Sequence, residues 1–200
     1  MCGLTGWMSF KRNLNEHESI AKAMTNTMAN RGPDDEGIWL DKHIFLGHRR
    51  LSVIDLEGGH QPMEAGNEFG TRAVISYTGE VYNYRELREE LIAAGHQFLT
   101  QSDTEVVLKA YLEWGERFVE RLNGMYAFAI WDVLRQELIL VRDRMGVKPL
   151  YYYPLQKNEI LFGSEPKAIL AHPEVEAVVD AEGLREIFSI VKTPGHAIFQ

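Results

Sequence analysis

The chain begins MCGLTGWMSF (residues 1–10), an apolar run that carries the only cysteine of the protein in second position. Most chain termini are frayed, but residues 4–10 predict a strand that would anchor this terminus in a core. Removal of Met1, which the small Cys2 side chain favours, would leave one residue with both a thiol and a free α-amine.

Such a residue could catalyse acyl transfer without a partner from elsewhere in the fold. A free α-amine has a reference pKa of ~7.7–8.0, so it can serve as the base for the thiol of its own residue. One cysteine is a weak motif, however, and an incidental small residue near a terminus is an equally good interpretation of Cys2.

Composition excludes several classes of protein. Of the 200 residues, 45% are hydrophobic and 25% are charged, and one cysteine cannot form a disulfide scaffold. The formal net charge of −8 disfavours nucleic acid and anionic membranes as partners. No segment approaches the ~20 apolar residues that span a bilayer, and Lys11 and Arg12 follow the apolar run, whereas a secretory signal has its basic residues first. We therefore expect a globular protein of the cytoplasm.

Hydrophobic periodicity outlines the elements outside the first strand. Further strands are expected at 38–46, 73–78, 125–131, 137–142 and 159–163, with a hairpin turn near Arg135-Gln136. Helices are expected from a capping box at Asn15 and Glu18, from Asn83 to Gly95, from the Ser102 to Glu105 capping box, and at 166–171 and 181–188. Strands and helices come in clusters without regular alternation, which predicts a layered α+β domain.

Three other features could bind a small molecule, and each has a plainer interpretation. Arg49 and Arg50 follow a strand-like stretch, where an arginine could clamp a carboxylate or simply be solvated. The N–H of Gly79 could face a developing oxyanion, or the glycine could only form a turn before a helix. Asp103 could bind a ligand or only favour the positive end of a helix dipole. The 7 histidines show no metal-ligand spacing, so no metal site is predicted.

Eight ordered motifs resemble one family over nearly the whole chain. They are MCGLTG (1–6), RGPDDEG (31–37), GHRRLSVIDL (47–56), GEVYNYRELR (79–88), SDTEVVL (102–108), LNGMYAFAIWD (122–132), RDRMGVKPLYYY (142–153) and GSEPKAIL (163–170). The family is the N-terminal glutaminase domain of glutamine-dependent asparagine synthetases, a class II glutamine amidotransferase. The resemblance implies a four-layer αββα sandwich of the N-terminal nucleophile hydrolase type over residues 2–190. Residues 191–200 would then begin a linker to a C-terminal synthetase domain.

The resemblance also implies a role for each candidate residue. Cys2 would be the nucleophile, Arg50 would hold the α-carboxylate of L-glutamine, and Asp103 would hold its α-ammonium group. The pocket would be completed by groups around Val53, Ile54 and Glu80. The N–H of Gly79 would stabilise the oxyanion while the thiolate displaces ammonia, and water would then release glutamate.

One position departs from the family pattern. Thr78 precedes Gly79 where the family usually has asparagine, so the side-chain amide that supplies half of the oxyanion hole is missing. A threonine hydroxyl can donate a hydrogen bond but is shorter. Because the loss of one oxyanion donor costs ~10²–10³ in turnover elsewhere, we expect reduced but real activity.

The partners follow from the same resemblance. The Ser-Gly-Gly-x-Asp-Ser loop that binds ATP in the synthetase half of the family does not occur here, so these residues are not expected to make asparagine alone. The glutaminase domain needs no cofactor, whereas the synthetase domain would use Mg-ATP. A homodimer is possible. Two alternatives stay open: a glutaminase that serves another acceptor, as in phosphoribosylpyrophosphate or hexosamine amidotransferases, and a docking or regulatory domain that has lost turnover.

Overall fold

The computed structural model describes residues 1–53, 55 and 58–190, in nine strands and seven helical segments. The strands are β1 (Gly3–Ser9), β2 (Asp35–Leu40), β3 (Ile44–Arg50), β4 (Met63–Asn67), β5 (Gly70–Val81), β6 (Gly124–Asp132), β7 (Glu137–Arg142), β8 (Tyr151–Gln156) and β9 (Glu159–Gly163). The helices are η1 (Leu14–Glu16), α1 (Glu18–Asn26), α2 (Tyr84–Ala93), α3 (Asp103–Trp114), η2 (Gly115–Arg121), α4 (Pro166–Leu170) and α5 (Ala181–Ile190). Ile54 and the expected linker at 191–200 lie outside the described residues.

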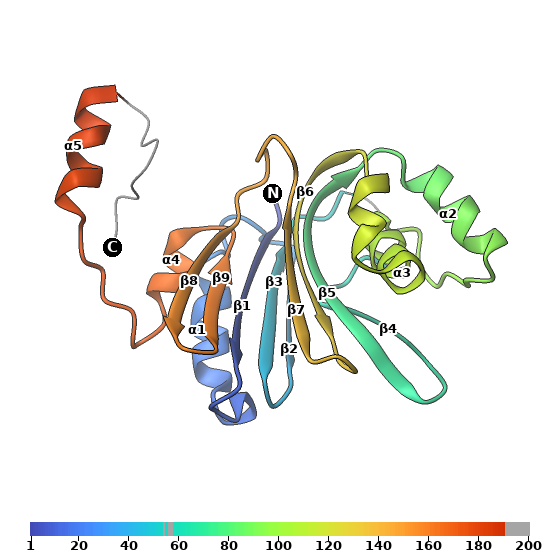
Figure 1. The fold of residues 1–200 in the computed structure, drawn as a ribbon, viewed down its shortest axis with the longest axis horizontal. Helices are drawn as coiled ribbons and strands as arrows, with labels where there is room; N and C mark the ends of the chain where they lie inside the picture. The colour runs from blue at the N-terminus through green and yellow to red at the C-terminus, as the bar shows by residue number, and fades with distance from the viewer. Residues whose placement is uncertain (54, 56–57, 191–200) are drawn as a thin grey trace.

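The strands form two antiparallel sheets that lie face to face (Figure 1). The first sheet has the order β2-β3-β1-β9-β8 and the second has the order β4-β5-β6-β7. The N-terminal strand β1 is therefore central, because it pairs with β3 on one side and with β9 on the other. This pairing fixes the terminus as the apolar run at residues 4–10 predicted.

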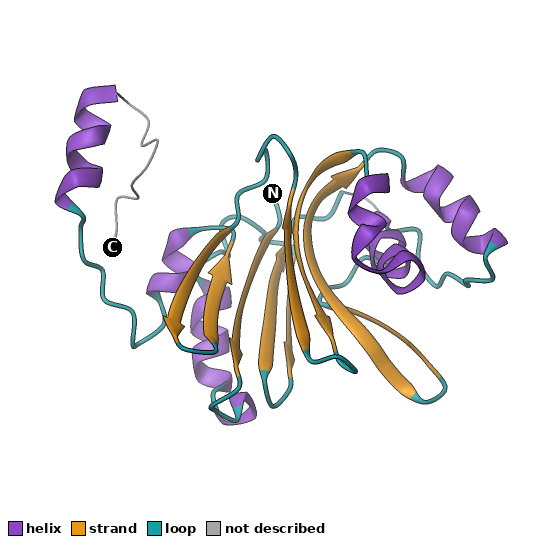
Figure 2. Ribbon diagram, viewed as in Figure 1, coloured by secondary structure: helices purple, strands orange, loops and turns teal. Residues whose placement is uncertain are grey.

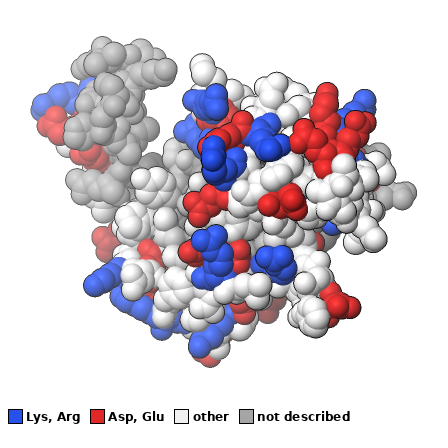
Figure 3. Space-filling model, turned by 45° about the vertical axis from the view of Figure 1, so that its right-hand side comes forward, with Lys and Arg blue, Asp and Glu red and all other residues white. Residues whose placement is uncertain are grey.

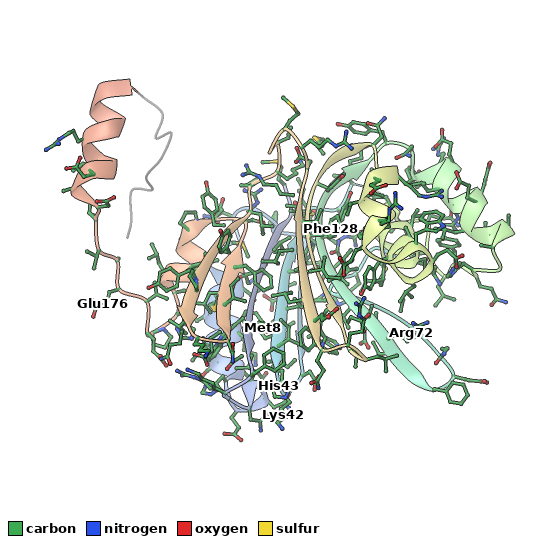
Figure 4. All side chains as sticks on the ribbon, viewed as in Figure 1. Met8, Lys42, His43, Arg72, Phe128 and Glu176 are labelled. Carbon is green, nitrogen blue, oxygen red and sulfur yellow. The ribbon has the colours of Figure 1, made fainter. Side chains whose placement is uncertain are left out.

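Three apolar layers hold the sandwich together, and helices cover both outer faces (Figure 2). Alternation along β1 directs Leu4 to the layer between the sheets and Trp7 to the layer under α1 and α4. Met8 of β1 also packs between the sheets, whereas Phe128 of β6 packs under α2 and α3 (Figure 4). The order helix, sheet, sheet, helix confirms the predicted αββα sandwich. Helix α5 lies apart from it (Figure 1).

Two predictions for the first third of the chain are wrong. Residues 38–46 do not form one strand, because a turn separates β2 from β3 and the Asp41 carboxylate accepts a hydrogen bond from Lys42 N at 2.7 Å. The residues on both sides of this short turn are apolar, so the hydrophobic pattern predicted one continuous strand. Asn15 does not cap a helix, since it lies within the short 3-10 helix η1 and α1 begins later, at Glu18.

The two strands that the sequence did not predict, β4 and β8, are both at sheet edges. Most side chains of these two strands are exposed or only partly buried, so their apolar pattern is weak. Pro154 in β8 is tolerated because one side of an edge strand needs no ladder hydrogen bonds. The predicted hairpin of β6 and β7 is confirmed, with Gln136 in its turn at φ 52°.

The helix predicted from Ser102 is confirmed, but its capping differs from a reciprocal capping box. Ser102 Oγ accepts a hydrogen bond from Thr104 N at 3.1 Å. The Glu105 carboxylate accepts from Leu99 N and Thr100 N in the preceding loop, which fixes that loop against the helix. At α2, the Asn83 side chain makes no cap bond; its Nδ2 donates to Arg121 O at 2.9 Å.

Candidate active site

A cavity of about 180 Å³ opens where the ends of the two sheets meet the start of α3, with far more room than the ~10–15 Å³ that one water needs. It is lined by seven of the eight predicted site residues: Cys2, Arg50, Val53, Thr78, Gly79, Glu80 and Asp103. The eighth, Ile54, is outside the described residues. Segments far apart in the sequence therefore meet at one site.

Strand pairing explains why Cys2 and Arg50 are neighbours. Gly3 of β1 is in register with Arg49 of β3, so the residues that follow β3 pass beside Cys2. Leu51 N donates a hydrogen bond to Cys2 Sγ at 3.3 Å, and the thiol lies 3.4 Å from Leu51 O. The thiol is held by backbone groups at the rim of the cavity.

The carbonyl of Cys2 is held from two sides. It accepts hydrogen bonds from Arg31 Nε at 2.6 Å and from Thr78 Oγ1 at 3.0 Å. With Met1 attached, the nitrogen of Cys2 is a peptide amide, and the terminal amino group belongs to Met1, which donates to Arg31 O at 2.9 Å. An amine base at Cys2 therefore requires removal of Met1.

Two hydrogen bonds between the sheets fix β5 against β3 beside the cavity. His48 Nε2 donates to Tyr77 O at 2.9 Å, and Ser76 Oγ donates to Gly47 O at 3.0 Å. His48 is fully buried, and this burial lowers its pKa to about 4. The ring is thus neutral at pH 7, with the proton on Nε2 that this hydrogen bond requires.

Asp103 is a buried carboxylate at the first turn of α3, only 4% exposed. Its Oδ2 accepts hydrogen bonds from Tyr77 OH at 2.7 Å and from Val81 N at 3.1 Å. Burial raises the pKa of Asp103 above its usual value, and these two hydrogen bonds oppose that rise. A buried carboxylate held by neutral donors is suited to receive a cationic group from the cavity.

The adjacent arginines at the end of β3 face opposite ways. Arg50 is 6% exposed and lines the cavity, where its Nη2 donates to Asp55 O. A side chain at position 59 would overlap this guanidinium, so Gly59 leaves room for it. Arg49 instead pairs with the exposed Glu36 at 2.5 Å on the outer surface. The burial of Arg50 in the cavity wall is what a carboxylate clamp would require, whereas the Arg49 side chain is 15% exposed and held in an ion pair, so it is not simply solvated.

Gly79 and Thr78 form the wall of the cavity on β5. Gly79 has φ +148°, and a Cβ at this position would overlap Met125 O of β6, so only glycine fits. Thr78 is 1% exposed, and its hydroxyl hydrogen is directed to the Cys2 carbonyl. The Thr78 hydroxyl therefore contacts the backbone of Cys2 as well as lining the cavity.

The cavity-lining residues that sequence reasoning missed include Gln61, Tyr77 and Lys148. Gln61 Oε1 accepts from Tyr77 N at 2.6 Å, and its Nε2 donates to Thr104 Oγ1 at 3.3 Å, so it joins β5 to α3. Lys148 is 8% exposed and belongs to the RDRMGVKPLYYY motif (142–153), to which no role in the site was assigned. In β5, alternate residues face the same side of the sheet, so Tyr77 could have been predicted to face α3. No sequence motif or periodic pattern indicates a role for Gln61.

Three further observations concern the described part of the chain as a whole. No group of three or more His, Cys, Asp and Glu side chains among the described residues could hold a metal ion. Acidic and basic side chains are intermixed on the face shown in Figure 3. None of the helices in the described ranges is both long enough and apolar enough to span a membrane.

Comparison with known proteins agrees with this architecture. A family model described as "Glutamine amidotransferase domain" matches residues 1–200. Asparagine synthetase [glutamine-hydrolyzing] 3 of Bacillus subtilis (strain 168) is 50% identical over 202 residues, which cover 100% of this chain and 33% of that protein. Asparagine synthetase B [glutamine-hydrolyzing] of Escherichia coli (strain K12) is 36% identical over 170 residues, 85% of this chain and 30% of its own length.

A solved structure shares the fold. The glutamine phosphoribosylpyrophosphate amidotransferase of B. subtilis superimposes with a TM-score of 0.69 at 20% identity, over 85% of this chain and 43% of that one. The chain spans about a third of the length of the curated relatives it matches. It belongs to the glutamine amidotransferase domain family, which confirms the resemblance seen in its sequence motifs.

Proposed function

We propose that this domain hydrolyses L-glutamine to glutamate and ammonia, with Cys2 as the nucleophile. The observation that supports this best is the cavity itself, which is lined by the only thiol of the chain, a buried arginine and a buried carboxylate. A zwitterionic amino acid presents the complementary charges: its α-carboxylate suits Arg50 and its α-ammonium group suits Asp103.

The reaction assigns one task to each group. After removal of Met1, the α-amine of Cys2 takes the thiol proton, and the thiolate forms a bond to the side-chain amide carbon of glutamine. The Gly79 N–H stabilises the resulting oxyanion, with Val53 and Glu80 completing the pocket. The proton passes to the amide nitrogen as the C–N bond breaks and ammonia leaves. Water then cleaves the thioester, which releases glutamate and restores the thiol.

The ammonia would be used by another part of a longer protein. The matched relatives are named as asparagine synthetases, and this chain covers only about a third of each. We therefore propose that residues 2–190 supply ammonia to a C-terminal synthetase domain, which converts aspartate to asparagine with Mg-ATP in the cytoplasm. The glutaminase domain itself would need no cofactor.

The test is to incubate the protein with glutamine and to measure glutamate release, while intact mass reports whether Met1 has been removed. A diazoketone analogue of glutamine should in parallel add one equivalent to Cys2. Glutamate release together with this adduct would support the proposal. Correctly processed protein that releases no glutamate and is not labelled at Cys2 would contradict it and favour a docking or regulatory domain.

Thr78→Asn is expected to raise turnover by roughly tenfold. Asparagine reaches further than threonine and carries two N–H donors, and one oxyanion donor is worth ~10²–10³ in other enzymes. The gain should be smaller here because the new side chain gives up the 3.0 Å hydrogen bond to the Cys2 carbonyl. The measurement is kcat for glutamate release.

Thr78→Val is the matched control for this prediction. Valine keeps the shape of threonine without a donor, so its turnover should not exceed that of the parent. A kcat for Thr78→Asn below the parent value would show that threonine at position 78 does not reduce turnover.

A further inference from the structure

We infer that Tyr77 is a positioning residue of this site, whose hydroxyl holds the Asp103 carboxylate in place for the α-ammonium group of the substrate. This inference rests on the proposed role of Asp103. It adds Tyr77, which was not among the predicted site residues. Tyr77 lies next to Thr78 on β5, but alternation turns its side chain away from Cys2 and toward α3.

Tyr77 is fixed at three separate points. Its hydroxyl donates to Asp103 Oδ2 at 2.7 Å, its N–H donates to Gln61 at 2.6 Å, and its carbonyl accepts from His48 at 2.9 Å. The side chain is only 2% exposed, and its ring packs against that of Phe128 with 6.2 Å between centroids. A ring constrained in this way holds its hydroxyl oxygen at one place beside Asp103.

The hydroxyl matters because Asp103 is buried. Two neutral donors, Tyr77 OH and Val81 N–H, reach the same carboxylate oxygen and favour its ionised form without cancelling its charge. Burial also raises the pKa of Tyr77 well above its usual value, so the hydroxyl stays protonated and acts as the donor. The negative charge of Asp103 is thereby left for a cation in the cavity.

Tyr111 supplies an internal comparison. Its hydroxyl donates to Asp132 Oδ2 at 2.8 Å, and Asp132 is also buried, at 8% exposure. Neither residue lines the cavity. Removing the hydroxyl from Tyr111 or from Tyr77 breaks the same kind of bond, but only Tyr77 connects to the site.

The first arm of the test compares the kinetics of Tyr77→Phe and Tyr111→Phe in the full chain. Tyr77→Phe should raise KM for glutamine about tenfold or more, since hydrogen bonds to charged groups are among the stronger ones, while kcat stays within about threefold. Tyr111→Phe should leave both constants at parental values. Thermal unfolding of both variants shows whether each is folded at the assay temperature.

The second arm uses 4-carbamoylbutanoate, which is glutamine without its α-amino group, as a competitive inhibitor of glutamine hydrolysis. Its Ki should be the same for the parent and for Tyr77→Phe, because it presents no cation to Asp103. An unchanged KM for glutamine in Tyr77→Phe, or an equal weakening of glutamine and 4-carbamoylbutanoate, would overturn the inference. A parent protein that does not hydrolyse glutamine would instead overturn the proposed function.

Discussion

Cys2→Ala is expected to reduce glutamate release from glutamine by about 10⁴-fold or more, to the level of a blank reaction. The chain has no second cysteine that could replace this nucleophile. The backbone donors and charged groups of the cavity would remain in the variant, but without a thiolate no thioester forms. Glutamate release is measured for both proteins after mass spectrometry has shown that Met1 is absent from each.

Unfolding should not account for this loss. Within the described residues, the Cys2 thiol hydrogen-bonds only to Leu51 backbone atoms, and the strand that follows is fixed by β3 and β9 on its two sides. We expect the free energy of unfolding of Cys2→Ala to lie within about 1 kcal/mol of the parent. Residual turnover within tenfold of the parent, in a folded variant, would exclude Cys2 as the nucleophile.

Asp103→Asn is expected to raise KM for glutamine by roughly 10²-fold or more with a smaller change in kcat. Losing one partner of a buried charge pair costs about 2–5 kcal/mol of binding, and asparagine offers the α-ammonium group no negative charge. The amide oxygen can still accept from Tyr77 OH and Val81 N, so the local structure is kept. Steady-state kinetics over a wide range of glutamine concentration measures both constants.

Asp103→Asn should weaken glutamine binding but should not lower the free energy of unfolding. Burial raises the pKa of Asp103 in the folded protein, so folding favours its protonated form. Its contribution to stability is therefore present at low pH and is lost as the pH rises through the folded pKa, which leaves the ionised group destabilising at neutral pH. Asp103→Asn should thus be at least as resistant to urea as the parent at pH 7.

Asp132→Asn is the matched control for this prediction. Asp132 is another buried aspartate that accepts a tyrosine hydroxyl, but it lies outside the cavity. Its replacement should leave KM for glutamine unchanged. If the two variants raised KM equally, the effect of Asp103→Asn would be structural and not a loss of ammonium binding.

Hydrophobic pattern predicted the central strands and the apolar edge strand β7, and it missed two edge strands whose side chains are largely exposed. β5 and β6 are central in their sheet, and their buried residues make a clear pattern. β4 and β8 are at the edges and are largely exposed, so selection for apolar residues at alternate positions is weak there. The short polar turn between β2 and β3 was missed because both flanking segments are apolar.

The sequence by itself determined the layered α+β class, the family and the identity of the candidate nucleophile, because periodicity and motifs are local properties that are read along the chain. Only the tertiary structure decided which neighbouring side chains share the cavity. Arg50 faces it and Arg49 does not, and Thr78 reaches Cys2 while Tyr77 reaches Asp103. These assignments depend on which face of a strand packs against the other sheet and which packs against α3, and that choice is made by long-range packing.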